Sequence, residues 1–159
     1  MTKWLTQPKY CQWLLDNRII EFIFAENPHV ELIKRSSELI RLLAQDETYL
    51  TTDIVDLLWV CCSEKHEDII RSSLDLVQDL ALSMPLERLA YLSGKIKAIK
   101  IEDFDEKLVH FLKHYTVNSM RNLKRLREQS KGGVMSSVLG KEKEVKIDEG
   151  RYVDLVLFW

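Results

Sequence analysis

The sequence predicts an all-α fold of stacked antiparallel helix pairs, and three observations support that prediction. Apolar residues recur at helical spacing through most of the 159 residues. Only five glycines and three prolines are present, which is too few for the many turns of an all-β fold. One helical unit occurs twice. A chain that is 46% apolar and 30% charged forms a core of its own and is neither a disordered tail nor a membrane protein.

Helix-start signals place the elements of the N-terminal part. Pro8 and Pro28 each suit the first turn of a helix, where the missing N–H of proline has no intrahelical partner to lose. Asn17 and Asn27 have side chains that accept hydrogen bonds from free backbone N–H groups, so both are expected N-caps. The predicted helices of this part cover residues 8–14, 19–24 and 28–44.

The central helices follow from the same signals. Thr51–Asp53 supplies two hydroxyls and a carboxylate at the start of a helix, and Pro85 starts another. Thr116–Ser119 is poor in helix formers, so we expect a break there, with Asn118 as the cap of a further helix through Leu126. The predicted helices cover residues 51–62, 66–82, 85–99, 104–115 and 119–126.

A repeat is the most informative feature. Residues 29–44 align with 66–81 at an offset of 37, and apolar, small and charged positions fall in register. The helices that follow these segments also align once the offset is reduced by three residues, which places Val55 over Leu89 and Leu58 over Leu92. A helix pair that recurs at about 40 residues is typical of armadillo and HEAT repeats, whose units must stack to bury their apolar faces. We therefore predict an armadillo/HEAT-like α-solenoid over residues 1–129.

The C-terminal residues differ in composition. The segment Ser130–Gly133 and the Lys-, Glu- and Ser-rich stretch after it predict a flexible loop over 130–150. Residues 151–159 are almost wholly apolar and predict the start of a further element, either a short strand or the first turns of another repeat helix. The helix is favoured because the rest of the chain is helical, and we expect the chain to be part of a longer protein.

Charge is divided unevenly along the chain. Residues 1–110 hold 13 Lys and Arg against 19 Asp and Glu, whereas residues 111–159 hold 10 against 6. Four cations lie close together on the last predicted helix, where an acidic protein partner is a better match than nucleic acid because the rest of the chain is acidic. Two tryptophans near the N-terminus are candidates for an inter-repeat surface. The expected interaction residues are Arg121, Lys124, Arg125, Arg127, Trp4 and Trp13.

Signals for catalysis and for metal binding are weak. The chain has no phosphate-binding glycine loop and no Gly-x-Ser-x-Gly motif. Cys11, Cys61 and Cys62 lack an activating histidine nearby in sequence, so we expect inert thiols in the core of a cytoplasmic protein, with the nucleus as an alternative compartment. His110 and His114 share a helical face, but solvated histidines explain them better than zinc does. We expect no catalytic residue, no cofactor and no metal.

Several runs in the sequence resemble a known family. They are Asn27–Ala44, Leu50–Trp59 and Lys65–Ile70, which together contain Leu-Thr-Thr-Asp-Ile-Val-Asp-Leu-Leu-Trp followed by Lys-His-Glu. This pattern resembles the non-catalytic helical region of large ubiquitin-specific proteases of the fat-facets type, over roughly residues 1–130. The cysteine box of their peptidase domain has no match here, because none of the cysteines precedes a tyrosine.

The resemblance implies a scaffold and not an enzyme. It implies an α-solenoid that positions substrates or partners for a cysteine peptidase elsewhere in a parent deubiquitinase. The partners implied are proteins, namely ubiquitin-pathway substrates or adaptors and neighbouring repeats of the parent, with neither nucleic acid nor membrane among them. The alternative that the repeats alone leave open is a HEAT or armadillo fragment of an unrelated scaffold or transport protein.

Overall fold

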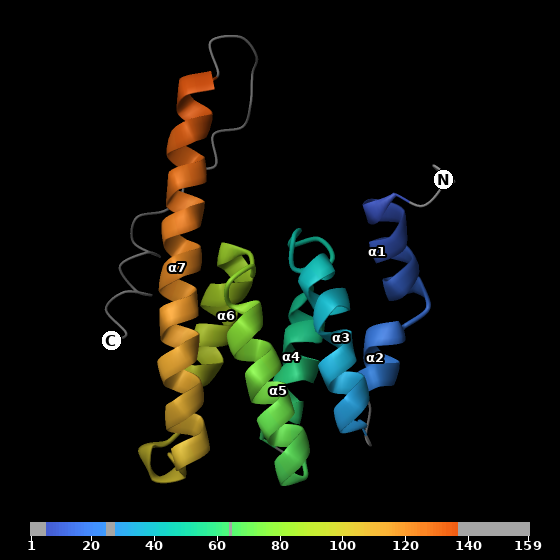
Figure 1. Cartoon of the computed structure of the whole chain (residues 1–159), viewed down its shortest axis with the longest axis vertical. Helices are drawn as coiled ribbons and strands as arrows, with labels where there is room; N and C mark the ends of the chain where they lie inside the picture. The colour runs from blue at the N-terminus through green and yellow to red at the C-terminus, as the bar shows by residue number, and fades with distance from the viewer. Residues whose placement is uncertain (1–5, 25–27, 64, 137–159) are drawn as a thin grey trace.

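The computed structural model describes residues 6–24, 28–63 and 65–136 (Figure 1). Within these ranges the chain forms α-helices and one short 3₁₀-helix and contains no strand, so the all-α prediction is confirmed. The elements are α1 (Gln7–Asp16), α2 (Ile19–Phe24), α3 (Val30–Leu43), α4 (Thr52–Cys61), α5 (Glu67–Leu80), α6 (Leu86–Lys97), η1 (Ile101–Asp103) and α7 (Glu106–Ser136).

The helices are arranged in two layers. In the first layer α3 contacts α5 and α5 contacts α7, and in the second layer α2 contacts α4 and α4 contacts α6. The layers are joined where α2 meets α3 and α4 meets α5, while α1 packs on α2 at one end. Figure 1 shows the resulting row, which runs across the molecule from α1 to α7. The core lies between the layers, because each helix buries one apolar stripe toward the other layer.

The predicted repeat is present in the structure. Helices α3 and α5 each have 14 residues and begin 37 residues apart, at Val30 and Glu67. A histidine occupies the N-cap of both, and the Nδ1 atom of His29 accepts a hydrogen bond from the backbone N–H of Glu31 at 3.2 Å. Equivalent positions are buried in both helices, as the pairs Ser36 and Ser73, Ile40 and Val77, and Leu43 and Leu80 show.

Polar contacts between helices join positions about one repeat apart. The Nε atom of Arg88 donates to the carbonyl of Leu50, 38 residues away, and the thiol of Cys61 donates to the carbonyl of Phe24, 37 residues away. Lys107 pairs with Glu67 at 3.2 Å across a separation of 40 residues. Because these bonds join similar points along neighbouring helices, the helices within one layer run parallel to each other.

Two asparagines fix the position of α7 against α5. The last carbonyls of a helix have no intrahelical donor and need one from outside. The Nδ2 atom of Asn122, whose side chain is buried, donates to the carbonyls of Ala81 and Met84 at 2.8 Å each. One turn earlier, Asn118 Nδ2 donates to the carbonyl of Gln78, also at 2.8 Å. These bonds satisfy the C-terminal end of α5 and thereby set its register with α7.

A buried tyrosine joins α7 to the second layer. The hydroxyl of Tyr115 lies 2.9 Å from the hydroxyl of Ser93 and donates to the carbonyl of Leu89 at 3.4 Å. Burial raises the pKa of Tyr115 above its ordinary value, because the phenolate would lose its hydration. The ring also stacks on Phe111 with their centroids 5.5 Å apart. Tyr115 therefore serves as a polar anchor inside an apolar core.

The predicted break at Thr116–Ser119 is wrong, because α7 runs through it without interruption. The Thr116 hydroxyl donates to the carbonyl of Leu112 at 2.6 Å, and Ser119 is buried. Asn118 bonds to Gln78 on α5 instead of capping a new helix. Tertiary contacts have therefore overridden the weak helix propensity of these residues.

Other predicted boundaries also change. Asn17 is the C-cap of α1, and its side chain donates to the carbonyl of Trp13 at 2.8 Å, so it does not cap the start of α2. The N-cap of α3 is His29, while Asn27 lies outside the described residues. Helix α7 continues to Ser136, so the loop predicted from residue 130 is wrong over its first seven residues. Residues 137–150 and the apolar segment 151–159 lie outside the described residues.

We predict that Asn122→Ala lowers the free energy of unfolding by about 2 kcal/mol, because it leaves two buried carbonyls without a donor. Asn118→Ala should cost less, about 1 kcal/mol, since that side chain serves one carbonyl and is only part-buried. Urea unfolding of the three proteins measures both changes. An Asn122→Ala protein as stable as the wild type would show that the register does not depend on this amide.

We predict that Tyr115 makes stability fall at alkaline pH. Its pKa is raised in the folded state, so above the ordinary tyrosine pKa of about 10 the unfolded chain loses this proton first. The contribution of the neutral Tyr115 side chain to the free energy of unfolding is complete below that pH. It is lost as the pH rises, by at most about 1.4 kcal/mol per pH unit. Tyr115→Phe should therefore flatten the profile of unfolding free energy above pH 10. Parallel profiles for the two proteins would contradict the prediction.

Candidate functional site

The three cysteines lie in the core and offer no nucleophile. Cys11, Cys61 and Cys62 are all buried, and burial raises the pKa of each thiol above its ordinary value. The thiol of Cys62 donates to the carbonyl of Leu58 at 3.4 Å, within its own helix turn. The prediction of core thiols is confirmed, and the thiolate that nucleophilic catalysis requires is disfavoured at all three positions.

His110 and His114 are neighbours on α7, as the sequence spacing predicts. Their ring centroids are 4.2 Å apart, and the Nδ1 atom of His114 lies 2.9 Å from the carbonyl oxygen of His110. In the part of the chain that the structure describes, no three His, Cys, Asp or Glu side chains come together as a metal site would require.

The predicted basic residues lie on α7, whose C-terminal part extends past α5 and α6 (Figure 1). We call Arg121, Lys124, Arg125 and Arg127 the basic arm, and all four are exposed. Leu123 is buried beneath them, whereas Met120, which we expected on the same apolar side as Leu123, is 44% exposed. The buried face of α7 differs from the predicted one because the side chain of Asn122 points inward to the end of α5.

One member of the basic arm also has a structural contact. The Nη2 atom of Arg125 donates to Oδ1 of Asn122 at 2.8 Å, on the amide that holds the end of α5. This bond orients the amide so that its nitrogen faces the two carbonyls. Arg121, Lys124 and Arg127 have no such part in the packing and are the better probes of a binding role.

Trp13 does not join the basic arm. Trp13 lies on α1, is 51% exposed and stacks on Tyr10 with their ring centroids 6.2 Å apart. Helices α1 and α7 stand at opposite ends of the row (Figure 1), so Trp13 and the basic arm are separate surfaces. Trp4 lies outside the described residues.

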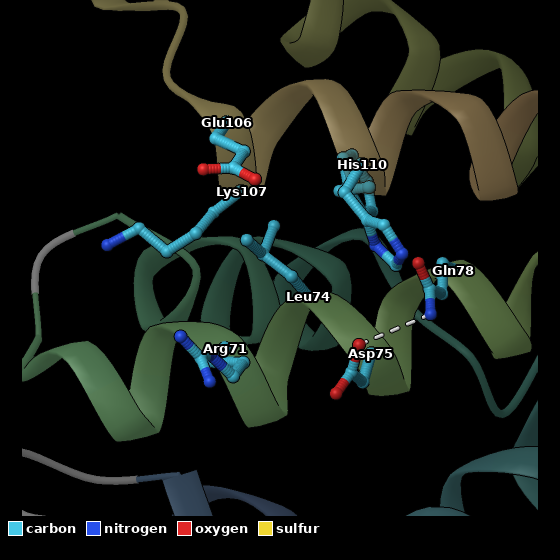
Figure 2. A pocket seen from close by; sticks show the side chains of 8 residues that line it. Arg71, Leu74, Asp75, Gln78, Glu106, Lys107 and His110 are labelled. Carbon is cyan, nitrogen blue, oxygen red and sulfur yellow. Dashed lines mark hydrogen bonds between the residues drawn. The ribbon is translucent and has the colours of Figure 1, made fainter.

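A groove between α5 and α7 was not predicted. It has a volume of about 400 Å³, and we call it the α5–α7 groove. Figure 2 shows its two walls, one from α5 and one from α7, above an apolar floor that includes Leu74. The lining residues are Arg71, Leu74, Asp75 and Gln78 from α5, and Glu106, Lys107, His110 and Phe111 from α7. The i, i+4, i+7 spacing of Arg71, Asp75 and Gln78 indicates one polar face, but it does not reveal the neighbour that closes the groove.

A second hollow adjoins this groove. Its volume is about 470 Å³, and it shares the side chains of Leu74 and Lys107 with the α5–α7 groove. Its walls come from the end of α4, from α5, from the segment around η1 and from the first turn of α7. They include the apolar side chains of Trp59, Ile70, Ile99 and Leu108 and the charged side chains of Lys100, Asp103 and Asp105. We call it the Trp59 hollow. The two depressions are therefore neighbours, and both have polar as well as apolar side chains in their walls.

None of the described helices is both long enough and apolar enough to cross a bilayer.

Comparison with known proteins gives a consistent result. The chain matches the family model of the UBP24/USP9X/USP9Y ARM repeat over residues 1–128. The probable ubiquitin carboxyl-terminal hydrolase FAF of Drosophila melanogaster is 26% identical over 134 residues, which cover 84% of this chain and 4% of that protein. Mouse ubiquitin carboxyl-terminal hydrolase 9X is 24% identical over 135 residues, or 84% of this chain and 5% of that protein.

A further relative covers a shorter stretch. Human ubiquitin carboxyl-terminal hydrolase 34 is 31% identical over 105 residues, which cover 55% of this chain and 3% of the relative. No solved structure matches the chain. This chain thus spans about a twentieth of the length of its first two relatives, over a region that carries helical repeats and no evident catalytic domain. The repeat pattern, the two-layered helical fold and the family match agree, and the chain belongs to the UBP24/USP9X/USP9Y ARM repeat family.

Proposed function

We propose that this chain is a non-catalytic scaffold region of a large ubiquitin-specific protease, and that it positions protein partners for a cysteine peptidase domain outside this chain. The observation that carries the proposal is the match of residues 1–128 to an ARM repeat of such proteases. Stacked helix pairs suit this role because they present an extended surface on a rigid frame. The buried, protonated thiols support the same conclusion, since they leave the described residues without a nucleophile.

The basic arm is the surface that we propose for an acidic protein partner. Its four cations are exposed, and they stand on a helix that extends beyond α5 and α6 (Figure 1). At physiological salt, screening limits their field to about 8 Å, so the arm acts on a surface that has already come close. The acidic partner is a ubiquitin-pathway substrate or adaptor, or a neighbouring repeat of the parent.

We predict that the isolated chain does not cleave ubiquitin conjugates. A ubiquitin–fluorophore substrate incubated with the purified chain should show no release above the rate of buffer alone. The physical reason is the absence of a thiolate–imidazole pair among the described residues. Cleavage that disappears in Cys11→Ala or Cys61→Ala would overturn the non-catalytic role.

We predict that the basic arm binds acidic polypeptide in a salt-dependent manner. Labelled poly-L-glutamate should bind the chain at low salt and weaken as salt rises, because exposed charges are screened. Replacing Arg121, Lys124 and Arg127 together by Glu should weaken binding by at least about tenfold, if each exposed contact contributes about 0.5 kcal/mol. Arg125 is left in place because it holds Asn122.

The matched control reverses three exposed cations at the other end of the row. Replacing Lys9, Lys34 and Arg35 by Glu changes the net charge by the same amount but leaves the basic arm intact. Equal weakening by the two triple variants would show that the probe senses net charge alone. Circular dichroism checks that both variants keep the helical content of the wild type.

A further inference from the structure

Helix α7 exposes apolar side chains on the side that faces away from the rest of the row. At about 100° per residue, the side chains of Asn118 and Asn122, which bond to α5, define the inner side of the helix. Six exposed residues lie on the opposite side, within an arc of about 80°. We call them the outer face of α7, and they are Val109, Lys113, Val117, Met120, Lys124 and Arg127.

The apolar members of the outer face have no cover among the described helices. Val109 is 55% exposed, and Val117 and Met120 are each 44% exposed. An amphipathic helix at the edge of a fold normally places polar residues on its solvent side. Three large apolar side chains grouped there indicate a surface that another segment covers.

Cations flank these apolar side chains. Among the described residues, no carboxylate lies within ion-pair distance of Lys113, Lys124 or Arg127. Lys107, earlier on the same helix, differs because it pairs with Glu67 and Asp105. The outer face therefore favours a segment that is both apolar and acidic.

The chain itself contains a segment of that composition. Residues 148–159 hold three carboxylates against Arg151 alone, and from Tyr152 onward every residue except Asp154 is apolar or aromatic. We call this stretch the C-terminal segment. An apolar run of this kind is an aggregation hazard unless it is covered. It lies beyond residues 1–128, which match the repeat family, so the repeat pattern assigns it no place.

The connection to the C-terminal segment is long enough. Residues 137–151 separate Ser136 from Tyr152, and fifteen residues span up to about 50 Å. Measured back along α7 from Ser136, Met120 is about 24 Å away and Val109 about 40 Å away. A tether of this kind gives an effective concentration in the millimolar range, so even a weak contact is populated.

The other exposed apolar side chains fit the C-terminal segment less well. Ile101 and Phe104 are 83% and 42% exposed, but the four other residues of 101–106 are all carboxylates, which repel an acidic segment. Phe22 is 79% exposed but lies on α2, near the opposite end of the row (Figure 1). Apolar exposure and unpaired positive charge coincide on the outer face of α7.

We propose that the C-terminal segment docks on the outer face of α7, with apolar side chains against Val109, Val117 and Met120 and carboxylates beside the flanking cations. Because Lys124 and Arg127 also belong to the basic arm, the docked segment competes there with an acidic partner. This competition rests on the proposed function of the basic arm, whereas the docking itself does not.

The test uses the full 159-residue chain labelled with ¹⁵N and carrying a nitroxide at Gly150→Cys. The three native thiols are buried, so the label reacts at the added cysteine. Docking should reduce the intensity of the amide signals of residues 109–124, relative to the same sample with the nitroxide reduced. The signals of helices α1 to α4 should not change.

A mixed sample separates docking within one chain from contact between copies. It combines nitroxide-bearing chain without ¹⁵N and ¹⁵N-labelled chain without nitroxide. The expected result is full signal intensity in this mixture. Loss of the signals of residues 109–124 here would place a second copy on the outer face and would overturn docking within one chain.

Neutral variants test the apolar contact. Replacing Val117 and Met120 together by Ser should lower the ratio of docked to free segment about tenfold and restore the signals. The matched control replaces Phe22 and Leu32 by Ser, which removes two exposed apolar side chains elsewhere and should leave the signal loss as in the wild type. Equal recovery in the two variants would contradict a specific contact.

Charge variants test the flanking cations. Lys113→Glu with Lys124→Glu should weaken docking about fivefold, because carboxylates then face the acidic segment. Lys9→Glu with Lys34→Glu changes the net charge equally and should leave docking as it is. Equal weakening by both pairs would refute a role for the cations of the outer face. Signal loss confined to residues beyond 130 would overturn the docking site.

Binding of poly-L-glutamate tests the competition. The variant with Ser at positions 117 and 120 keeps every cation of the basic arm, so release of the segment should tighten binding, by up to about tenfold. Unchanged affinity would overturn the competition. If the wild type and this variant both fail to bind poly-L-glutamate, the function of the basic arm is wrong, and the nitroxide experiment still decides the docking.

Discussion

Hydrogen bonds from the side chains of one helix to backbone carbonyls of its neighbour organise this fold. At the C-terminal end of α5, several carbonyls accept from the backbone that follows, but those of Gln78, Ala81 and Met84 accept from asparagines of the next helix of the layer. In the second layer Arg88 of α6 also donates to backbone carbonyls, those of Leu50 and Glu47 in the segment just before α4. Apolar burial brings the helices together, but these directional bonds decide how far one helix slides along its neighbour.

The range of these contacts along the chain limits how the parts communicate. The hydrogen bonds between the helices of one layer span 35 to 41 residues, so each unit is tied to the unit next to it. In such a structure, stability is approximately the sum of the unit stabilities and the interface energies between neighbours. A defect at the Asn122 contact therefore weakens the α5–α7 interface first, while α1 and α2 at the far end lose none of their own contacts.

Much of the fold could be predicted, because helix periodicity and a repeated unit are properties of short sequence windows. The offset of 37 between residues 29–44 and 66–81 placed α3 and α5 correctly. The continuity of α7 could not be predicted, because Thr116–Ser119 is helical only in contact with α5. The basic arm was visible as a cluster of cations, whereas the α5–α7 groove was not, since Asp75 and His110 are brought together by packing between helices.

The length of α7 has a consequence for the periodicity of the array. Helix α7 has 31 residues, about 46 Å at 1.5 Å per residue, whereas α5 has 14. The starts of α4 and α6, Thr52 and Leu86, are 34 residues apart, and a third second-layer helix at that spacing would begin near residue 120. That position lies inside α7, so the described residues hold no second-layer helix at that spacing. Within the described residues the regular alternation of the two layers therefore ends at α7, where a single helix occupies about the length of a helix pair.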